Sequence, residues 1–132
     1  MSAATGTCLC GKSKVEIRNY PTDAKSHIRC HCKDCALTSG SAFSTNILIK
    51  EVDVQFGGPV KTFDSKAASG NTVTRFFCGN CGCALAHNTP AFGDAMAIQT
   101  GPFIDIYQKI DFGTELFAQG KWAGVAVPQS HL

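Results

Sequence analysis

The sequence has little charge and no long apolar run. Charged residues make up 17% of its 132 positions, and the formal net charge at pH 7 is +2. A nucleic-acid-binding or chromatin module would carry a basic stripe or tail, which this balance does not provide. No segment approaches the roughly 20 consecutive apolar residues of a transmembrane helix. We therefore expect neither a nucleic-acid partner nor a membrane-inserted segment.

The first residues also lack a secretory signal, because no basic segment precedes an apolar one. A cytoplasmic location with reduced thiols is the resulting expectation. The length fits a single domain over residues 1–132. The apolar fraction of 44% is too high for a disordered chain. Nothing in the sequence indicates an oligomeric state.

Cysteine is the residue present in excess. Eight cysteines fall into three clusters, which read Cys8-Leu-Cys10-Gly11, Cys30-His-Cys32-Lys-Asp-Cys35 and Cys78-Gly-Asn-Cys81-Gly82-Cys83. Disulfide frameworks usually spread their cysteines, whereas zinc takes two thiolates from one tight turn, each about 2.3 Å from the metal. Three such clusters in a chain without a secretory signal favour metal binding over disulfides.

The spacing also suggests how the cysteines divide between metals. Four of them make a closed set of the structural kind, whose binding free energy contributes to folding: Cys8, Cys10, Cys78 and Cys81. Three remain as thiolates with a vacant fourth position, the arrangement of catalytic sites: Cys30, Cys32 and Cys35. Cys83 is left over as a small hydrophobe, a reactive thiol or a fourth ligand. Spacing alone permits other pairings of the clusters.

Several side chains have two interpretations. Cys83 or His31 would close the second site and make it structural, although alternation along the chain points His31 away from the metal, toward a hydrogen-bonding or surface role. His87 is a candidate proton shuttle near neutral pH or an ordinary packed histidine. Phe117 and Trp122 are expected in the core rather than on a stacking platform.

The remaining pattern predicts short strands. Lys14–Arg18 alternates with period two, and further β-prone runs cover 27–30, 42–49, 52–56, 60–63, 71–77, 84–87 and 95–100. One helical turn is expected at 34–38, ended by Gly40. The tail after Gly101 gives no clear secondary-structure signal. The prediction is a mainly β fold of antiparallel sheets, stapled by zinc where strand ends meet.

The motifs resemble those of the glutathione-dependent formaldehyde-activating enzymes, a family grouped with centromere protein V. The three cysteine clusters carry the resemblance, together with Ser39-Gly40-Ser41-Ala-Phe43, Ser69-Gly70, Arg75-Phe-Phe77 and Gly101-Pro-Phe-Ile-Asp105. The resemblance implies a β-tent fold like that of methionine-R-sulfoxide reductases. It also implies two zinc ions per chain, one structural on the closed set and one near which glutathione binds. Cys83 departs from the family, in which many members have a small non-cysteine residue there.

The resemblance implies a carbon–sulfur lyase working in reverse, which joins formaldehyde to the glutathione thiol. The chemistry of the predicted Cys30, Cys32 and Cys35 site agrees, because three thiolates make zinc a poor Lewis acid and a bound thiol is deprotonated outright. The expected substrate is glutathione or a glutathione adduct with formaldehyde or another small electrophile. Arg29 and Lys33 are candidates for binding its carboxylates, and Phe43 for lining the pocket. The alternatives are a non-catalytic zinc-stapled binding module and a thiol redox enzyme.

Overall fold

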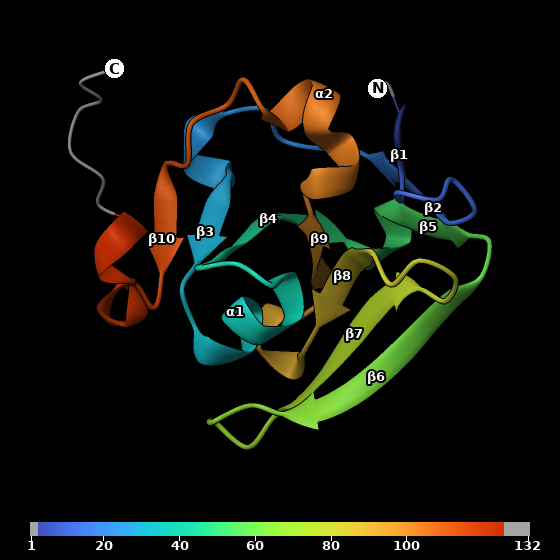
Figure 1. Cartoon of the computed structure of the whole chain (residues 1–132). Coiled ribbons are helices and arrows are strands. Elements are labelled where there is room, and N and C mark those ends of the chain that lie inside the picture. The colour runs from blue at the N-terminus through green and yellow to red at the C-terminus, as the bar shows by residue number, and fades with distance from the viewer. Residues whose placement is uncertain (1–2, 126–132) are drawn as a thin grey trace.

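Two β-sheets make up most of the computed structural model, which describes residues 3–125 (Figure 1). The smaller sheet is antiparallel in the order β1-β2-β5, with β1 at Ala3–Thr7, β2 at Lys14–Arg18 and β5 at Val54–Gly57. The larger sheet has the order β10-β3-β4-β9-β8-β7-β6. The mainly β prediction is confirmed.

The seven strands of the larger sheet are mostly antiparallel to their neighbours. Their bounds are β3 Ile28–Cys30, β4 Ser44–Lys50, β6 Val60–Lys66, β7 Thr72–Cys78, β8 Ala84–Asn88, β9 Ala95–Gln99 and β10 Thr114–Leu116. One pair is parallel: β10, which is far from β3 in the sequence, lies beside β3 and runs in the same direction. This pairing, and the strand β1, were not predicted from the sequence.

The helical segments are short. The α-helices are α1 at Lys33–Ser39 and α2 at Ile104–Tyr107. Single 3-10 turns cover Ala24–Ser26, Glu51–Asp53, Pro90–Phe92, Gly101–Phe103, Ala118–Gly120 and Ala123–Val125. In the described part of the chain, neither α-helix is long or apolar enough to cross a membrane.

The core lies between the two sheets. Val15 and Ile17 alternate with exposed residues along β2 and are fully buried, as the period-two pattern predicts. From the larger sheet, Ile47 of β4 and Ile98 of β9 belong to the same apolar cluster. Phe56 of β5 stacks on Phe76 of β7 with ring centroids 4.9 Å apart. Side chains of both sheets therefore share one core.

The prediction that Phe117 and Trp122 lie in the core is wrong. Both side chains are more than half exposed, whereas Phe103 and Tyr107 are buried. The reason is the position of β10, which forms an edge of the larger sheet and leads the following residues away from the apolar cluster. Phe117 itself adopts a left-handed conformation with φ 55° directly after this strand.

Candidate functional site

The first cysteine cluster joins two strand ends from different sheets. Cys8 and Cys10 lie in the turn between β1 and β2, while Cys78 and Cys81 lie in the turn between β7 and β8. The four sulfur atoms lie within 4.8 Å of one another, so the set could hold a metal ion. The sulfur of Cys10 is 3.5 Å from that of Cys8 and 3.7 Å from that of Cys78. Tetrahedral zinc with 2.3 Å bonds requires about 3.8 Å between sulfurs, so this donor set fits the ion.

The two turns have similar local structure. Each contains a glycine with positive φ, Gly11 at 82° and Gly82 at 79°, which allows the backbone to curl around the sulfurs. The backbone N–H of Ser13 donates to the Cys8 sulfur, and that of Cys81 donates to the Cys78 sulfur. The Ser13 side chain, followed by the Cys81 backbone N–H, lowers the pKa of Cys78 to about 5. Cys8 and Cys78 therefore have lowered pKa values, which favours the thiolate form that binds metal, whereas the pKa of Cys81 is raised.

The second cluster lies at the junction of β3 and α1. Cys30 ends the strand, and Cys32 caps the helix by accepting a hydrogen bond from the backbone N–H of Cys35 at 3.2 Å. The three sulfurs again lie within 4.8 Å of one another and could hold a metal ion, with Cys30 and Cys35 buried and Cys32 half-buried. Gly40 ends the helix with φ 64°, as predicted.

The thiols of the second cluster are mutually coupled through hydrogen bonds. The Cys35 side chain lowers the pKa of Cys30, and the same contact together with burial raises the pKa of Cys35. Of this pair, Cys30 is therefore the thiol that loses its proton more readily. Binding of a metal ion to the cluster requires the thiolate form, so it is accompanied by proton release.

Two polar residues of β4 support this cluster. Ser44 lies opposite Cys30 in the β3–β4 ladder, and the pKa of Cys35, raised by Cys30 and by burial, is partly brought back by a hydrogen bond from the Ser44 side chain. Asn46 Nδ2 donates to Ser44 Oγ at 2.9 Å. Ser44 is 2% exposed and Asn46 4% exposed. A buried polar chain therefore leads from the Cys35 sulfur into the sheet.

Arg29 and His31 are held on the other side of β3 by Glu115 of β10. The Glu115 carboxylate lies 2.6 Å from Arg29 Nη2 and 2.9 Å from His31 Nε2. Its pKa is lowered, chiefly by the hydrogen bond from His31. The Arg29 guanidinium also lies over the rings of Phe43 and Phe112, 5.2 and 5.4 Å from their centroids. His31 thus faces away from the sulfurs, in agreement with the alternation argument.

A groove of about 620 Å³ lies between the two clusters. Its wall contains Leu9 and Cys83 from the first cluster's turns, and Phe43 and Ser44 from the segment that follows α1. Thr38 and Ser39, on the same helix as Cys35, also line it. The groove therefore adjoins the second cluster through Ser44 and α1.

Cys83 lies beside the first cluster rather than within the second. Its thiol bonds the carbonyl of Ala84, and burial raises its pKa, which does not favour a reactive thiolate. Among residues 3–125, neither Cys83 nor His31 joins the set formed by Cys30, Cys32 and Cys35. All eight cysteines are free thiols. The described residues thus supply three sulfur ligands to the second site and no fourth.

His87 does not behave as a shuttle at neutral pH. It is 8% exposed, and burial, with a smaller effect of Arg75, lowers its pKa to about 4. The ring is therefore neutral near pH 7. It packs against Phe92 and is not among the groove-lining residues.

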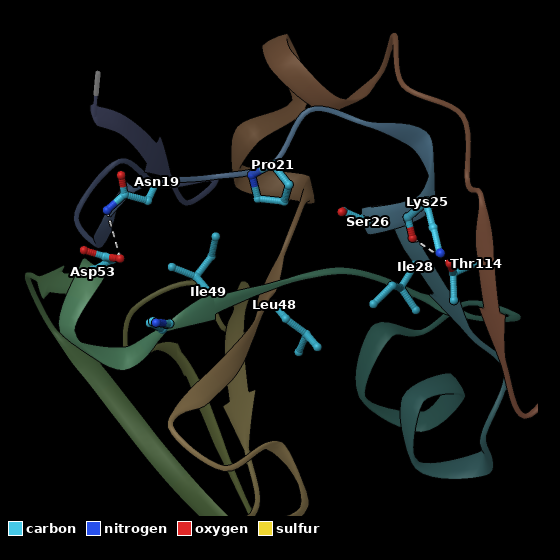
Figure 2. A pocket seen from close by; sticks show the side chains of 10 residues that line it. Asn19, Pro21, Lys25, Ser26, Ile28, Leu48, Ile49, Asp53 and Thr114 are labelled. Atoms are coloured by element: carbon cyan, nitrogen blue, oxygen red, sulfur yellow. Dashed lines mark hydrogen bonds between the residues drawn. The ribbon is translucent and has the colours of Figure 1, made fainter. Parts of the chain in front are cut away.

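A second hollow, of about 680 Å³, lies elsewhere on the larger sheet (Figure 2). Leu48 and Ile28 form part of its wall, with Lys25 and Asp53 at its border. Asn19 spans part of the rim by donating to Asp53 at 3.1 Å. No cysteine is among its lining residues, so the larger hollow is not the one that serves the sulfur clusters.

Sequence reasoning located the cysteines but missed the polar residues around them. Ser44 begins β4, Asn46 lies within it and Gln99 ends β9, and a polar residue in a β-prone run ordinarily indicates the face that is exposed to solvent. Only the strand register places them beside Cys30 and the groove. Arg75 was also missed as a site candidate, and its Nη1 donates to Thr38 Oγ1 at the groove's border.

Comparisons with known proteins agree with the geometry. A family model described as glutathione-dependent formaldehyde-activating enzyme matches residues 3–119. The crystal structure of a Rhodobacter sphaeroides protein is similar with a TM-score of 0.60 and 15% sequence identity, covering 82% of this chain and 91% of that chain. At that identity the likeness shows the fold. No curated protein matches the chain.

Proposed function

Because the chain belongs to the glutathione-dependent formaldehyde-activating enzyme family, we propose that it is a zinc-dependent carbon–sulfur lyase or synthase. Its substrate is glutathione or a glutathione adduct with formaldehyde or another small electrophile. The reaction takes place at Cys30, Cys32 and Cys35, while Cys8, Cys10, Cys78 and Cys81 hold a structural zinc. We also propose a cytoplasmic location, where glutathione is abundant and thiols stay reduced.

One observation carries this proposal: a set of three sulfurs beside an open groove. The described part of the chain offers no fourth ligand to this set, and Cys32 is its partly exposed member. Cys30, Cys32 and Cys35 would hold a zinc ion there, and such an ion would favour the thiolate form of a bound thiol. The first cluster, in contrast, has four sulfurs and fits a closed structural site.

The overall reaction balances without any redox partner. In the forward direction the glutathione sulfur bonds to the carbon of formaldehyde. The C=O π pair moves onto oxygen, and the proton lost by the thiol ends on that oxygen. The reverse reaction breaks the same carbon–sulfur bond.

The chain's own residues hold the three cysteine sulfurs beside which the substrate thiol would bind. Ser44 and Asn46 fix Cys35, and the Cys32 cap fixes the start of α1, so the three sulfurs are held in one geometry. Phe43 lines the groove and supplies apolar surface to the substrate. A thiol bound beside these sulfurs would lie next to the groove, in which a small electrophile can be oriented for reaction with it.

The carboxylates of glutathione require a cation at the groove's border. Arg29 and Lys33 remain candidates, although Arg29 is already paired with Glu115. Arg75 is a further candidate because it donates to Thr38, a groove residue, through a single guanidinium nitrogen. Its remaining N–H groups suit a carboxylate.

Titration of glutathione into the zinc-loaded protein tests the proposal. We expect calorimetry to show binding, and X-ray absorption to show an added sulfur neighbour at one of two zinc ions. Methionine, a thioether of similar polarity without a thiol, serves as the control ligand. Absence of glutathione binding, with an unchanged zinc spectrum, would overturn the proposed function.

A further inference from the structure

The groove beside the second cluster contains no charged side chain among its lining residues. Its polar groups are the hydroxyls of serine and threonine, the Cys83 thiol and the amide of Gln99. A ligand inside it is therefore recognised by neutral hydrogen-bonding groups, and its carboxylates must lie toward the border. The substrate specificity of the groove depends on which of these neutral groups lack a partner within the protein.

Two buried amide oxygens lack a hydrogen-bond partner among the described residues. Gln99 is 8% exposed and lines the groove, and its Oε1 accepts no hydrogen bond within the described residues. Asn46 Oδ1 is likewise buried and unpartnered within residues 3–125. The two residues are direct partners across the β4–β9 ladder, so their side chains lie on one face. Buried carbonyl oxygens of this kind require a donor.

The orientation of the Asn46 amide is fixed by Ser44, which lies opposite Cys30 in the β3–β4 ladder. The Ser44 side-chain oxygen accepts a hydrogen bond from Asn46 Nδ2 at 2.9 Å, which leaves Oδ1 as the free end of the amide. Asn46, one member of the acceptor pair, is thus hydrogen-bonded to Ser44, which lies beside the site where a thiol is proposed to bind.

The strand spacings place the acceptor pair close to the second cluster. Two residues along a strand advance about 7 Å, which separates Ser44 from Asn46, and a cross-strand pair such as Asn46 and Gln99 has Cβ atoms about 5 Å apart. In a cysteinyl compound the N–H groups lie a few bonds from the sulfur. A sulfur at the cysteine cluster therefore brings its own N–H groups toward Gln99.

We propose that Gln99 and Asn46 form an acceptor subsite that selects thiols carrying an N–H donor close to the sulfur. Cysteinyl peptides belong to this class, whereas thiols of similar charge without an N–H do not. This inference rests on the proposed function and adds to it the chemical feature by which the substrate is recognised. Gln99 contacts the ligand, and Asn46 supplies the second acceptor behind it.

The test compares two thiols on three zinc-loaded proteins by calorimetry. The ligands are glutathione and 3-mercaptopropionate, which has a thiol and a carboxylate but no N–H. The proteins are the wild type, Gln99→Met and the matched control Gln108→Met, at an exposed position outside the groove. In Gln99→Met we expect glutathione to bind about tenfold more weakly, from the loss of one buried hydrogen bond. Binding of 3-mercaptopropionate should stay within about twofold, and Gln108→Met should match the wild type.

The outcomes separate the subsite from the proposed function. If Gln99→Met weakens both thiols equally, or neither, the acceptor subsite is wrong while thiol binding stands. If neither thiol binds the wild type, the proposed function itself is wrong. Gln99→Glu covers the case in which the methionine variant does not fold, because it keeps the side-chain shape and the acceptor oxygens. It should retain the wild-type preference for glutathione, and loss of that preference would also overturn the subsite.

Discussion

The sulfur atoms of Cys10 and Cys78 lie 3.7 Å apart, although 68 positions separate the two residues along the chain. Cys10 follows a strand of the smaller sheet and Cys78 ends a strand of the larger one. A metal ion bound by this cluster therefore connects the two sheets at one end of the core. Its binding free energy is part of the free energy of folding, because the unfolded chain offers no preformed site.

The first prediction concerns this connection. Cys81→Ser removes one of four thiolates and should lower the metal content from about two zinc ions per chain to about one or fewer. Loss of a structural metal ligand is among the severe destabilising changes, so cooperative thermal unfolding should be lost or shifted strongly downward. Elemental analysis and circular dichroism measure the two effects.

Cys83→Ser is the matched control for that variant. Cys83 lies in the same turn region but outside both sulfur sets. It should keep both zinc ions and a melting temperature close to that of the wild type. If Cys83→Ser loses a zinc ion, then Cys83 is a ligand and the assignment of four sulfurs to the first site is incorrect.

The second prediction concerns the three-sulfur site. Cys32→Ser should lose only the second zinc ion and with it glutathione binding, while the folded domain remains. The reason is that Cys32 caps a single short helix, where a serine hydroxyl also accepts the backbone N–H bond. Zinc analysis, calorimetry and thermal unfolding together check this. Unfolding as complete as that of Cys81→Ser would contradict the division into a structural and an open site.

The sequence predicted the features that depend on local spacing. Two cysteines in one turn lie close together whatever the rest of the chain does. The pairs Cys8 with Cys10 and Cys78 with Cys81 could therefore be predicted from their spacing. The alternation of Val15 and Ile17 similarly predicted β2 and its buried face. Gly40 marked the end of α1 because a left-handed residue ends a helix.

The features that depend on strand register could not be predicted from the sequence. Asn46 faces Gln99 only because β4 and β9 pair at that register, and a shift of one residue would place both on the opposite face. Glu115 meets Arg29 and His31 because β10 returns to pair parallel with β3. The same position of β10 leaves Phe117 exposed, although an apolar phenylalanine side chain is usually buried.

The third prediction concerns the backbone around the first cluster. Gly58 has φ +85°, and a Cβ there would lie 1.9 Å from the carbonyl oxygen of Lys12, in the turn that carries Cys10. Gly58→Ala should therefore destabilise the fold by about 3 kcal/mol or more, combining left-handed strain with a backbone clash. Gly70→Ala is the control, since φ is +90° but no atom lies within 4 Å. It should cost about 1 kcal/mol. Chemical denaturation measures both, and equal costs would show that the close approach to Lys12 is relieved without strain.

The fourth prediction concerns pH. His87 is neutral in the folded protein because burial lowers its pKa to about 4, whereas an unfolded histidine has a pKa near 6.5. The unfolded state therefore takes up the proton first, so this contribution to stability is fully present above pH 6.5 and is lost as pH falls toward 4. Between pH 7 and pH 5 the loss should be about 2 kcal/mol. His87→Gln, which stays neutral, should lack this part of the acid sensitivity, while acid release of zinc affects both proteins equally. Urea unfolding at the two pH values measures the difference, and identical pH dependence in the two proteins would contradict the burial of a neutral His87.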